Sequence, residues 1–386
     1  MRVWVTFLWG IFCACSWTWC IGMYLPRIMI ERFGWPGFIV FAVPNVLGCA
    51  AFGYIVRIRG RSEAMIARHG VAMTAFSAVT VAYHMFFVVW LFAELIGGPY
   101  GQLWQPLTAA VIVFLLGLVL SFLDNRDWLV LSVLVYALSL TTFAMIGISP
   151  LKTIAWDGAQ SHHELAWLTP VIVFGFLLCP YLDLTFHRAI QNSPSRNAFA
   201  LFGIAFFVMI LLTCVIWFPR SDALRGIALA HILAQSVFTV GAHLREIRVS
   251  PAIHNRERRW LIMAAPLLAA PLLFIARMFS DAGALGEDLY LRFLVFYGLV
   301  FPAYVLLFTK FSHRTLKLTR RGVAMYATIV LLSIPFYELG FLHQWAWLLV
   351  FPIGVMMLMA LLPIHTATVT YVVDEPKSNA LDDPRQ

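Results

Sequence analysis

Long apolar segments separated by short polar ones make up almost the whole chain. Twelve such segments, each about 18–25 residues long, run from Val3 to His365. A helix needs roughly 20 apolar residues to cross the hydrocarbon core of a bilayer, so this pattern predicts an all-α polytopic membrane protein with about 12 transmembrane helices. We expect the spans at residues 4–25, 36–57, 71–97, 104–123, 128–149, 165–184, 198–218, 226–244, 260–279, 289–309, 322–342 and 345–364.

The composition excludes an ordinary soluble domain. Hydrophobic residues make up 61% of the chain and the mean hydropathy is +0.84. The longest polar gap between spans, from Ser250 to Arg259, is too short to form a core of its own. Only residues 371–386, which are rich in Asp, Pro and Asn, are typical of a disordered tail.

The basic residues predict the orientation of the spans. Of the 27 lysine and arginine residues, 20 fall at the termini or in alternate gaps between spans. Cytoplasmic loops retain positive charge, so we expect both termini in the cytoplasm and the protein in the inner (plasma) membrane. The net charge of +8 then lies mostly on one face, where anionic lipid headgroups explain it without a nucleic-acid partner.

Motifs of catalysis and of metal binding are absent from the sequence. The chain has no G-x-S-x-G, H-E-x-x-H, phosphate-loop or dinucleotide-binding pattern in a suitable context, so we expect no enzyme activity and no cofactor. The six cysteines all fall within predicted spans, and the three nearest the N-terminus lack paired C-x-x-C spacing. We therefore expect neither disulfides nor a metal site, and we interpret the N-terminus as an uncleaved first span.

Helix-breaking residues occur within the first and the sixth span. Gly22 and Pro26 interrupt the first, and Gly175 and Pro180 interrupt the sixth. These two spans enter the membrane from opposite sides under the charge count. Interrupted helices at matching places in two inverted halves indicate a secondary-transporter site, where unwound backbone faces solute and ions. Glycine and proline are also common in transmembrane helices generally, so ordinary packing is the alternative interpretation.

Several segments resemble the sodium:solute symporter family. Residues 178–200 are similar to the end of its sixth core helix and the basic loop that follows, with Asp183, His187 and Arg188 at the positions of two glutamines and an arginine. Residues 19–34 look like the first core helix, residues 41–70 look like the second with its loop, and residues 241–247 look like the close of the eighth. The resemblance covers about residues 10–247 and contains no invariant string.

This resemblance implies the five-plus-five inverted repeat of LeuT-type transporters. The first repeat would be residues 1–149 and the second residues 150–310, followed by two peripheral helices in residues 311–370 and the tail 371–386. It also implies solute contacts near the helix breaks, for which the side-chain and backbone candidates are Ser16, Trp19, Gly22, Asn45, Phe174 and Gly175. Core packing remains open for Trp19, and capping of the local bend remains open for Asn45.

The expected sodium site departs from the family pattern. Aligning on residues 244–247 places His231 and Ile232 where sodium-coupled members carry an adjacent Ser/Thr pair, and Ser16 where some carry a carboxylate. The site is therefore expected to be degraded, with a proton at His231 as the alternative coupling ion. Ser236 and Thr239 on the same helix could serve instead if the alignment is displaced by a turn.

Polar residues within spans suggest two further features. His231 and Gln235 form an i,i+4 pair, for which a proton relay and a satisfied interhelical hydrogen bond both remain open. Asp183, His187 and Arg188, at the inner end of span 6, favour a cytoplasmic gate or salt link.

Together these patterns favour a secondary transporter that moves a small organic solute by alternating access, with Na⁺ or H⁺ as coupling ion. The class of solute stays open. The alternative is a symporter-like module that does not transport and instead acts as a sensor, a scaffold or a subunit with a membrane-protein partner.

Overall fold

The computed structural model describes residues 2–56, 60–96, 104–217, 222–264, 282–309 and 318–361. Within these ranges the chain is helical and contains no strand, and eight helices are long and apolar enough to cross a membrane. Shorter apolar helices cover Arg2–Trp17, Trp104–Leu120 and Ala346–Leu358. The predicted span 260–279 is described only as far as residue 264, and the predicted tail 371–386 lies outside the described residues.

The helices follow one another with short connections. In the first part of the chain these are α1 (Arg2–Trp17), α2 (Cys20–Ile55), α3 (Arg61–Ile96), α4 (Trp104–Leu120), α5 (Asn125–Ile146) and the 3₁₀ turn η1 (Ser149–Thr153). The middle of the chain holds α6 (His162–Leu178), the 3₁₀ turn η2 (Cys179–Leu182), α7 (Leu184–Asn192), α8 (Ala198–Ile216) and α9 (Asp222–Val249). The last part holds α11 (Ala282–Val295), the π-turn η3 (Phe296–Val300), α12 (Phe301–Phe308), α13 (Arg320–Tyr337), the π-turn η4 (Glu338–Leu342), the 3₁₀ turn η5 (Ala346–Leu349) and α14 (Val350–Leu361).

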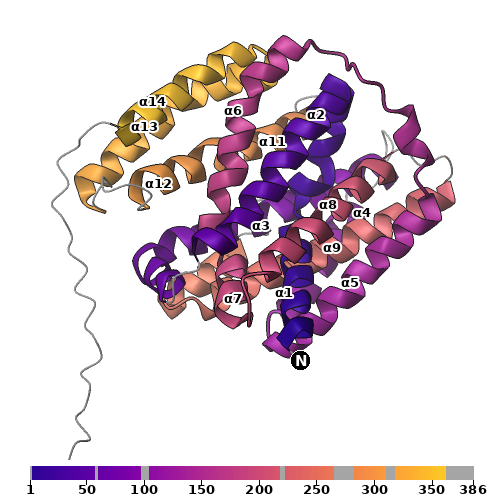
Figure 1. The fold of residues 1–386 in the computed structure, drawn as a ribbon, viewed down its shortest axis with the longest axis horizontal. Helices are drawn as coiled ribbons and strands as arrows, with labels where there is room; N and C mark the ends of the chain where they lie inside the picture. Colours follow the sequence, from indigo (N-terminus) through magenta and orange to yellow (C-terminus); the bar gives the residue numbers. More distant parts are fainter. Residues whose placement is uncertain are drawn as a thin grey trace, which may run out of the picture.

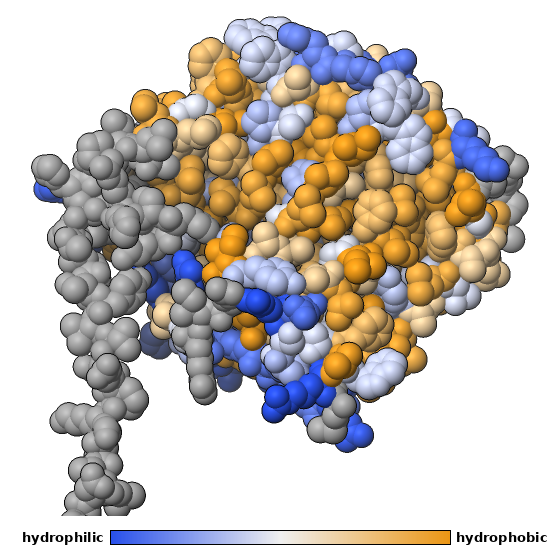
Figure 2. Space-filling view, viewed as in Figure 1, coloured by the Kyte–Doolittle hydropathy of each residue, from blue (hydrophilic) through white to orange (hydrophobic). Residues whose placement is uncertain are grey.

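The side chains are distributed as in a membrane protein. On α5 the buried stripe is Trp128, Ser132, Val135, Ser139, Thr142 and Ile146, while leucines and valines on its other faces are exposed. Small polar residues that point inward and aliphatic residues that point outward are typical of helices packed in lipid. Figure 2 shows the same arrangement on the whole face, with apolar residues between polar residues at the two ends of the view.

Helix α2 is two helices joined at Gly34. This residue has φ 64° and ψ −149°, a conformation open essentially to glycine alone. The chain therefore turns back here, so that residues 20–33 complete the first predicted span and residues 35–55 form the second. The loop before α6 closes on this turn: the Gln160 N–H donates to the Arg32 carbonyl at 2.7 Å, and the Ala159 N–H to the Glu31 carbonyl at 3.1 Å.

Helices distant in sequence pack in two main groups (Figure 1). In the first, α8 packs against α1 and α2, and α2 packs against α6. In the second, α9 packs against α3 and α4, which also contact each other. Helix α1 contacts α5 and α9 as well, and α13 and α14 pack together at one side of the molecule.

Candidate functional site

The first predicted span is interrupted between Trp17 and Cys20. Helix α1 ends at Trp17, and Trp19 has extended backbone angles (φ −81°, ψ 173°) before α2 begins. The hydroxyl of Thr18 donates to the Ala14 carbonyl at 2.7 Å, and that of Ser16 to the Cys13 carbonyl at 3.3 Å. These side-chain hydrogen bonds compete with the backbone hydrogen bonds of the last turn of α1, which favours the end of the helix at Trp17.

The sixth predicted span is interrupted between Leu178 and Leu184. Pro180 lacks the N–H that α6 would need to continue, and the chain makes a 3₁₀ turn instead. Asp183 then caps α7, because its Oδ1 accepts from the Thr185 N–H at 2.7 Å.

The two interruptions meet in the middle of the protein. The Thr185 hydroxyl donates to the Ser16 Oγ at 3.1 Å, and the rings of Trp17 and Phe186 lie 4.8 Å apart. Residues from distant parts of the chain thus join the start of α7 to the end of α1.

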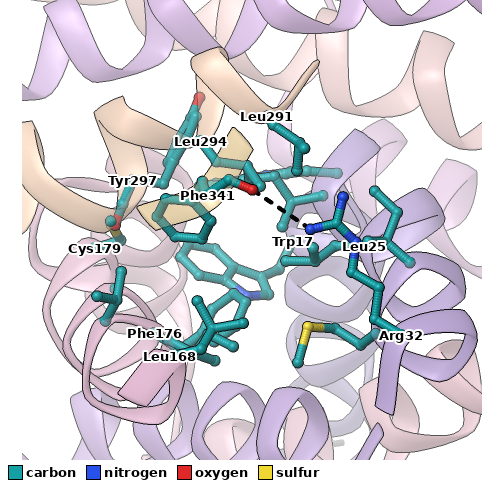
Figure 3. A pocket seen from close by; sticks show the side chains of 18 residues that line it. Trp17, Leu25, Arg32, Leu168, Phe176, Cys179, Leu291, Leu294, Tyr297 and Phe341 are labelled. Carbon is teal, nitrogen blue, oxygen red and sulfur yellow. Dashed lines mark hydrogen bonds between the residues drawn. The ribbon is translucent and has the colours of Figure 1, made fainter. Parts of the chain in front are cut away.

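Two tryptophans from the first interruption, Trp17 and Trp19, line one wall of a cavity, in which Figure 3 shows Trp17. Their ring centroids lie 4.1 Å apart, and both indole N–H groups are used inside the protein. The Trp17 Nε1 donates to the Asn45 Oδ1 at 2.8 Å, and the Trp19 Nε1 to the Ser16 carbonyl at 2.6 Å. Ser16 and Asn45 therefore fix the orientation of the two indole rings through these hydrogen bonds and do not line the cavity themselves.

The rest of the cavity is mostly apolar. Its volume is about 60 Å³, and its lining comes from both interrupted helices and from α11 and η3. Besides the tryptophans, the lining includes Leu25, Arg32, Cys179, Leu291, Leu294 and Tyr297. Arg32 is the charged residue of this lining, and Figure 3 shows its bond to the Phe341 carbonyl at the edge of the cavity.

Histidines stabilise the helix interruption from the α3 and α9 side. The His84 Nδ1 bonds the Thr80 carbonyl at 2.8 Å and therefore carries the proton, which leaves Nε2 to accept from the Cys20 N–H at 3.1 Å. His84 thus satisfies one of the free N–H groups at the start of α2. The ring of His243 packs edge-on against Trp19, at 5.7 Å between centroids.

Thr239 lies against the first interruption. Its hydroxyl is 3.4 Å from the carbonyl oxygens of both Cys15 and Thr18. Thr239 is two turns further along α9 than His231, and its neighbour Phe238 has no hydroxyl. The alignment that placed His231 and Ile232 at the ion site stays a prediction.

His231 instead faces α5. The Ser139 hydroxyl donates to the Val135 carbonyl, so it accepts both from the His231 Nδ1 at 2.9 Å and from the Gln235 amide at 3.0 Å. The interhelical hydrogen bond considered for this pair is therefore present. The His231 Nε2 and the Gln235 Oε1 are buried without a hydrogen-bond partner among the described residues, as is the Ser236 hydroxyl.

The three residues predicted as a gate have different partners. Arg188 forms an ion pair with Glu246 on α9 at 3.0 Å, and Phe12 and Trp128 pack against its guanidinium. His187 donates to the Tyr181 carbonyl through Nε2 and bonds the Ser62 hydroxyl through Nδ1. The salt link predicted near Arg188 is thus made with Glu246, whereas Asp183 caps α7.

A second charged link lies at the far end of residues 20–33. Arg32 is 3.4 Å from the Glu287 carboxylate, and the Tyr24 hydroxyl donates to the other oxygen of Glu287 at 3.3 Å. This link joins the end of the first predicted span to α11.

The predicted position of the first break is wrong, whereas the second break is at Pro180 as predicted but not at Gly175. Gly22 and Pro26 lie inside α2 and Gly175 lies inside α6, so the interruptions are at residues 18–19 and 179–183. Gly175 still lines the cavity, where an added Cβ would lie 2.8 Å from the Tyr297 carbonyl. Gly22 and Phe174 are not among the lining residues, whereas Trp19 is.

Trp17, like Trp19, precedes the expected break of span 1, and its sequence position left stacking on a solute and core packing both open. Arg32 escaped the sequence analysis, because its position indicated only an outward positive charge. Tyr297 gave no usable signal in the sequence. It lies in the π-turn η3, and such turns are frequent at functional sites but are visible only in the structure.

Comparisons with known proteins do not assign a family. No protein-family model matches the chain, and no curated protein matches it significantly.

Proposed function

We propose that the protein is a secondary transporter of a small organic solute, with the cavity beside Trp17 and Trp19 as its solute site. The observation that carries this proposal is the meeting of two interrupted helices from different parts of the chain at that cavity. Transporters place such unwound segments at the binding site near the middle of the membrane. Trp17 and Trp19 come from the first interruption, and Cys179 comes from the second.

The packing supports a LeuT-type arrangement of two repeats, residues 1–149 and 150–310. If the first helix of each repeat is the interrupted one, α8 corresponds to the second half of α2, and α9 corresponds to α3. The helices of one packing group, α1, α2, α6 and α8, are then the first two helices of each repeat. The other group contains α3 and α9, the third helix of each repeat. Equivalent helices that pack together are expected of two halves related by a pseudo-twofold axis.

The two charged links are candidate gates for alternating access. The Arg188–Glu246 pair lies beside α1, and the Arg32–Glu287 pair lies at the opposite end of the interrupted span. We propose that each link opens in turn as one packing group moves against the other. Under the expected orientation the first link faces the cytoplasm and Asp183, His187 and Arg188 belong to that gate.

We propose that sodium is not the coupling ion. The oxygens of Cys15, Thr18 and Thr239 approach one another, but hard cations take about six oxygen ligands, and Phe238 supplies none. His231 offers a different route, because its Nε2 has a free lone pair that can take up a proton.

The decisive experiment is uptake by purified protein in proteoliposomes. The substrate is sought with a panel of radiolabelled carboxylates, amino acids, sugars and nucleobases, and empty liposomes serve as the control. Accumulation that depends on the protein and on an ion gradient supports the proposal. If a solute binds the cavity but is never moved, the protein is instead a sensor, scaffold or subunit built on a transporter-like fold.

A further inference from the structure

The polar side chains of the cavity already have hydrogen-bond partners in the protein, and all but one make a bond of 3.3 Å or shorter. Besides the two indoles, the Tyr297 hydroxyl bonds the Thr80 hydroxyl at 2.9 Å, and the Cys179 thiol donates to the Tyr297 carbonyl at 3.3 Å. A sugar or another polyol would bring several hydroxyls into a site that offers them no partners, and unsatisfied buried groups disfavour binding. The exception among the lining residues is Arg32.

The guanidinium of Arg32 is held only loosely by the protein. Its Nη1 lies 3.5 Å from the Phe341 carbonyl and its Nη2 lies 3.4 Å from Glu287, both beyond the usual 2.7–3.2 Å of an N–H···O bond. A guanidinium carries five N–H donors in a planar fork that matches a carboxylate. The side chain is 21% exposed, so a solute can reach it without unfolding the site.

The size and walls of the cavity limit the rest of the solute. A cavity of about 60 Å³ has room for about four water molecules, and so for a solute of about four to six non-hydrogen atoms. Leu25, Leu291 and Leu294 line it together with the two tryptophans. These walls fit a short aliphatic chain, because they gain from apolar contact and make no hydrogen bonds.

We propose that the solute is a short aliphatic monocarboxylate, whose carboxylate binds Arg32 and whose chain lies against Trp17 and Trp19. This inference rests on the proposed function, since it takes the cavity as the solute site. It adds the chemical class of the solute and the residue that recognises it. Glu287 then competes with the solute for Arg32, so that binding of the acid also loosens the link between α2 and α11.

Isothermal titration of the purified full-length protein with butyrate tests this proposal. Butyramide, which has the same shape without the charge, and glycerol, a small polyol, are the matched ligands. We expect butyrate to bind at least tenfold more tightly than either, and decanoate to bind less well because the cavity is too short for it.

Variants of the two charged residues locate the binding group. Arg32→Gln should weaken butyrate binding at least tenfold, and Arg32→Lys should weaken it less. Glu287→Gln should leave it unchanged or tighten it, because the competing carboxylate is gone. Arg27→Gln is the control, since Arg27 lies one turn away, pairs with Glu31 and is not part of the lining. Unchanged thermal unfolding of Arg32→Gln would show that the loss is not one of folding.

Equal binding of butyramide, unchanged binding by Arg32→Gln, or no binding of butyrate overturns the proposal. These results are distinct from a failure of the proposed function. Transport of another solute without butyrate binding would support the transport function and refute the monocarboxylate. Butyrate that binds through Arg32 but is never transported would support the monocarboxylate site and refute the transport function.

Discussion

Arg188 and Glu246 form an ion pair that is almost completely buried. The Arg188 Nη1 lies 3.0 Å from the Glu246 Oε1, and the two side chains are 5% and 7% exposed. Arg245 also reaches Glu246, at 3.1 Å, so one carboxylate balances two guanidinium groups. Removal of Glu246 leaves the buried Arg188 without a counter-charge, which costs about 3–5 kcal/mol, and removal of Arg188 costs less because Arg245 still pairs with Glu246.

We therefore expect Arg188→Gln and Glu246→Gln each to lower the thermal unfolding temperature of the purified protein. The double variant should lose less than the sum of the two, since the residues interact directly. Arg196→Gln, at an exposed position beside Tyr54, is the control and should have little effect. Strict additivity of the two single effects would contradict the pairing.

The hydrogen bond between Trp17 and Asn45 predicts that loss of its donor lowers both stability and solute binding. Trp17→Phe keeps an aromatic wall but removes the donor to the Asn45 Oδ1, whose other contact is the Cys49 thiol at 3.7 Å. An unsatisfied buried acceptor costs about 1–3 kcal/mol, so both stability and solute binding should fall. The matched change Trp4→Phe, at a residue that is 70% exposed, should alter neither. Solute binding at the wild-type level in Trp17→Phe would show that the hydrogen bond to Asn45 is not needed for the binding site.

Ion replacement and two substitutions test the coupling. We expect uptake in proteoliposomes to persist when choline replaces sodium, and Thr239→Ala to change it less than about twofold, because the oxygen set around Thr239 is incomplete for a hard cation. Collapse of uptake in choline, together with loss of activity in Thr239→Ala, would restore sodium as the coupling ion.

His231 is tested by the response to a proton gradient. Wild-type uptake should rise when the outside is more acidic than the inside, and His231→Gln should lose this response while it keeps exchange of solute between the two sides. Glutamine can still bond Ser139 but cannot take up a proton, so the variant separates packing from proton uptake. A full proton response in His231→Gln would exclude this residue as the coupling group.

Glycine is required at the turn between the two parts of α2. In Gly34→Ala the new Cβ would lie 2.3 Å from the Trp156 carbonyl, at a backbone conformation with φ 64°. We expect a loss of about 1–3 kcal/mol from the strained backbone alone, seen as a lower unfolding temperature. Gly147→Ala isolates the strain, because Gly147 has φ 73° but no atom within 4 Å of the added Cβ. Equal effects of the two changes would show that the contact with the loop is unimportant.

The orientation in the membrane can be read by labelling single cysteines. The six native cysteines are buried, so the unmodified protein should react little with an impermeant maleimide. Asn255→Cys should then be labelled only after the membrane is permeabilised, and Asp157→Cys should be labelled from outside, as the distribution of basic residues predicts. The opposite pattern would reverse the assignment of the two gates.

The sequence predicted which spans are interrupted and misplaced the interruption of span 1. Pro180 has a local effect, since it cannot donate to the ladder, and it lies inside the break of span 6. The break in span 1 comes before Gly22 and Pro26, at residues held by partners that no local pattern identifies. Asn45 bonds Trp17 across 28 residues, and His84 bonds the Cys20 N–H across 64.

The charged residues of the site could not be predicted from the sequence, because they are brought together from distant parts of the chain. Arg32 and Glu287 are 255 residues apart, and each alone resembles an ordinary polar residue at the end of a span. The register of α9 likewise could not be chosen from its sequence, because His231, Ser236 and Thr239 all are polar residues in one apolar helix. Contacts with α1 and α5 distinguish them.

The loop before α6 joins the two interrupted helices at the ends farthest from their interruptions. Its two backbone hydrogen bonds, from Gln160 to Arg32 and from Ala159 to Glu31, involve no side chain and so survive most substitutions. If residues 20–33 tilt, the start of α6 is pulled along with them, unless both bonds break. Residues 20–33 and the start of α6 are therefore tied together at the end of these helices that lies away from the contact between Thr185 and Ser16.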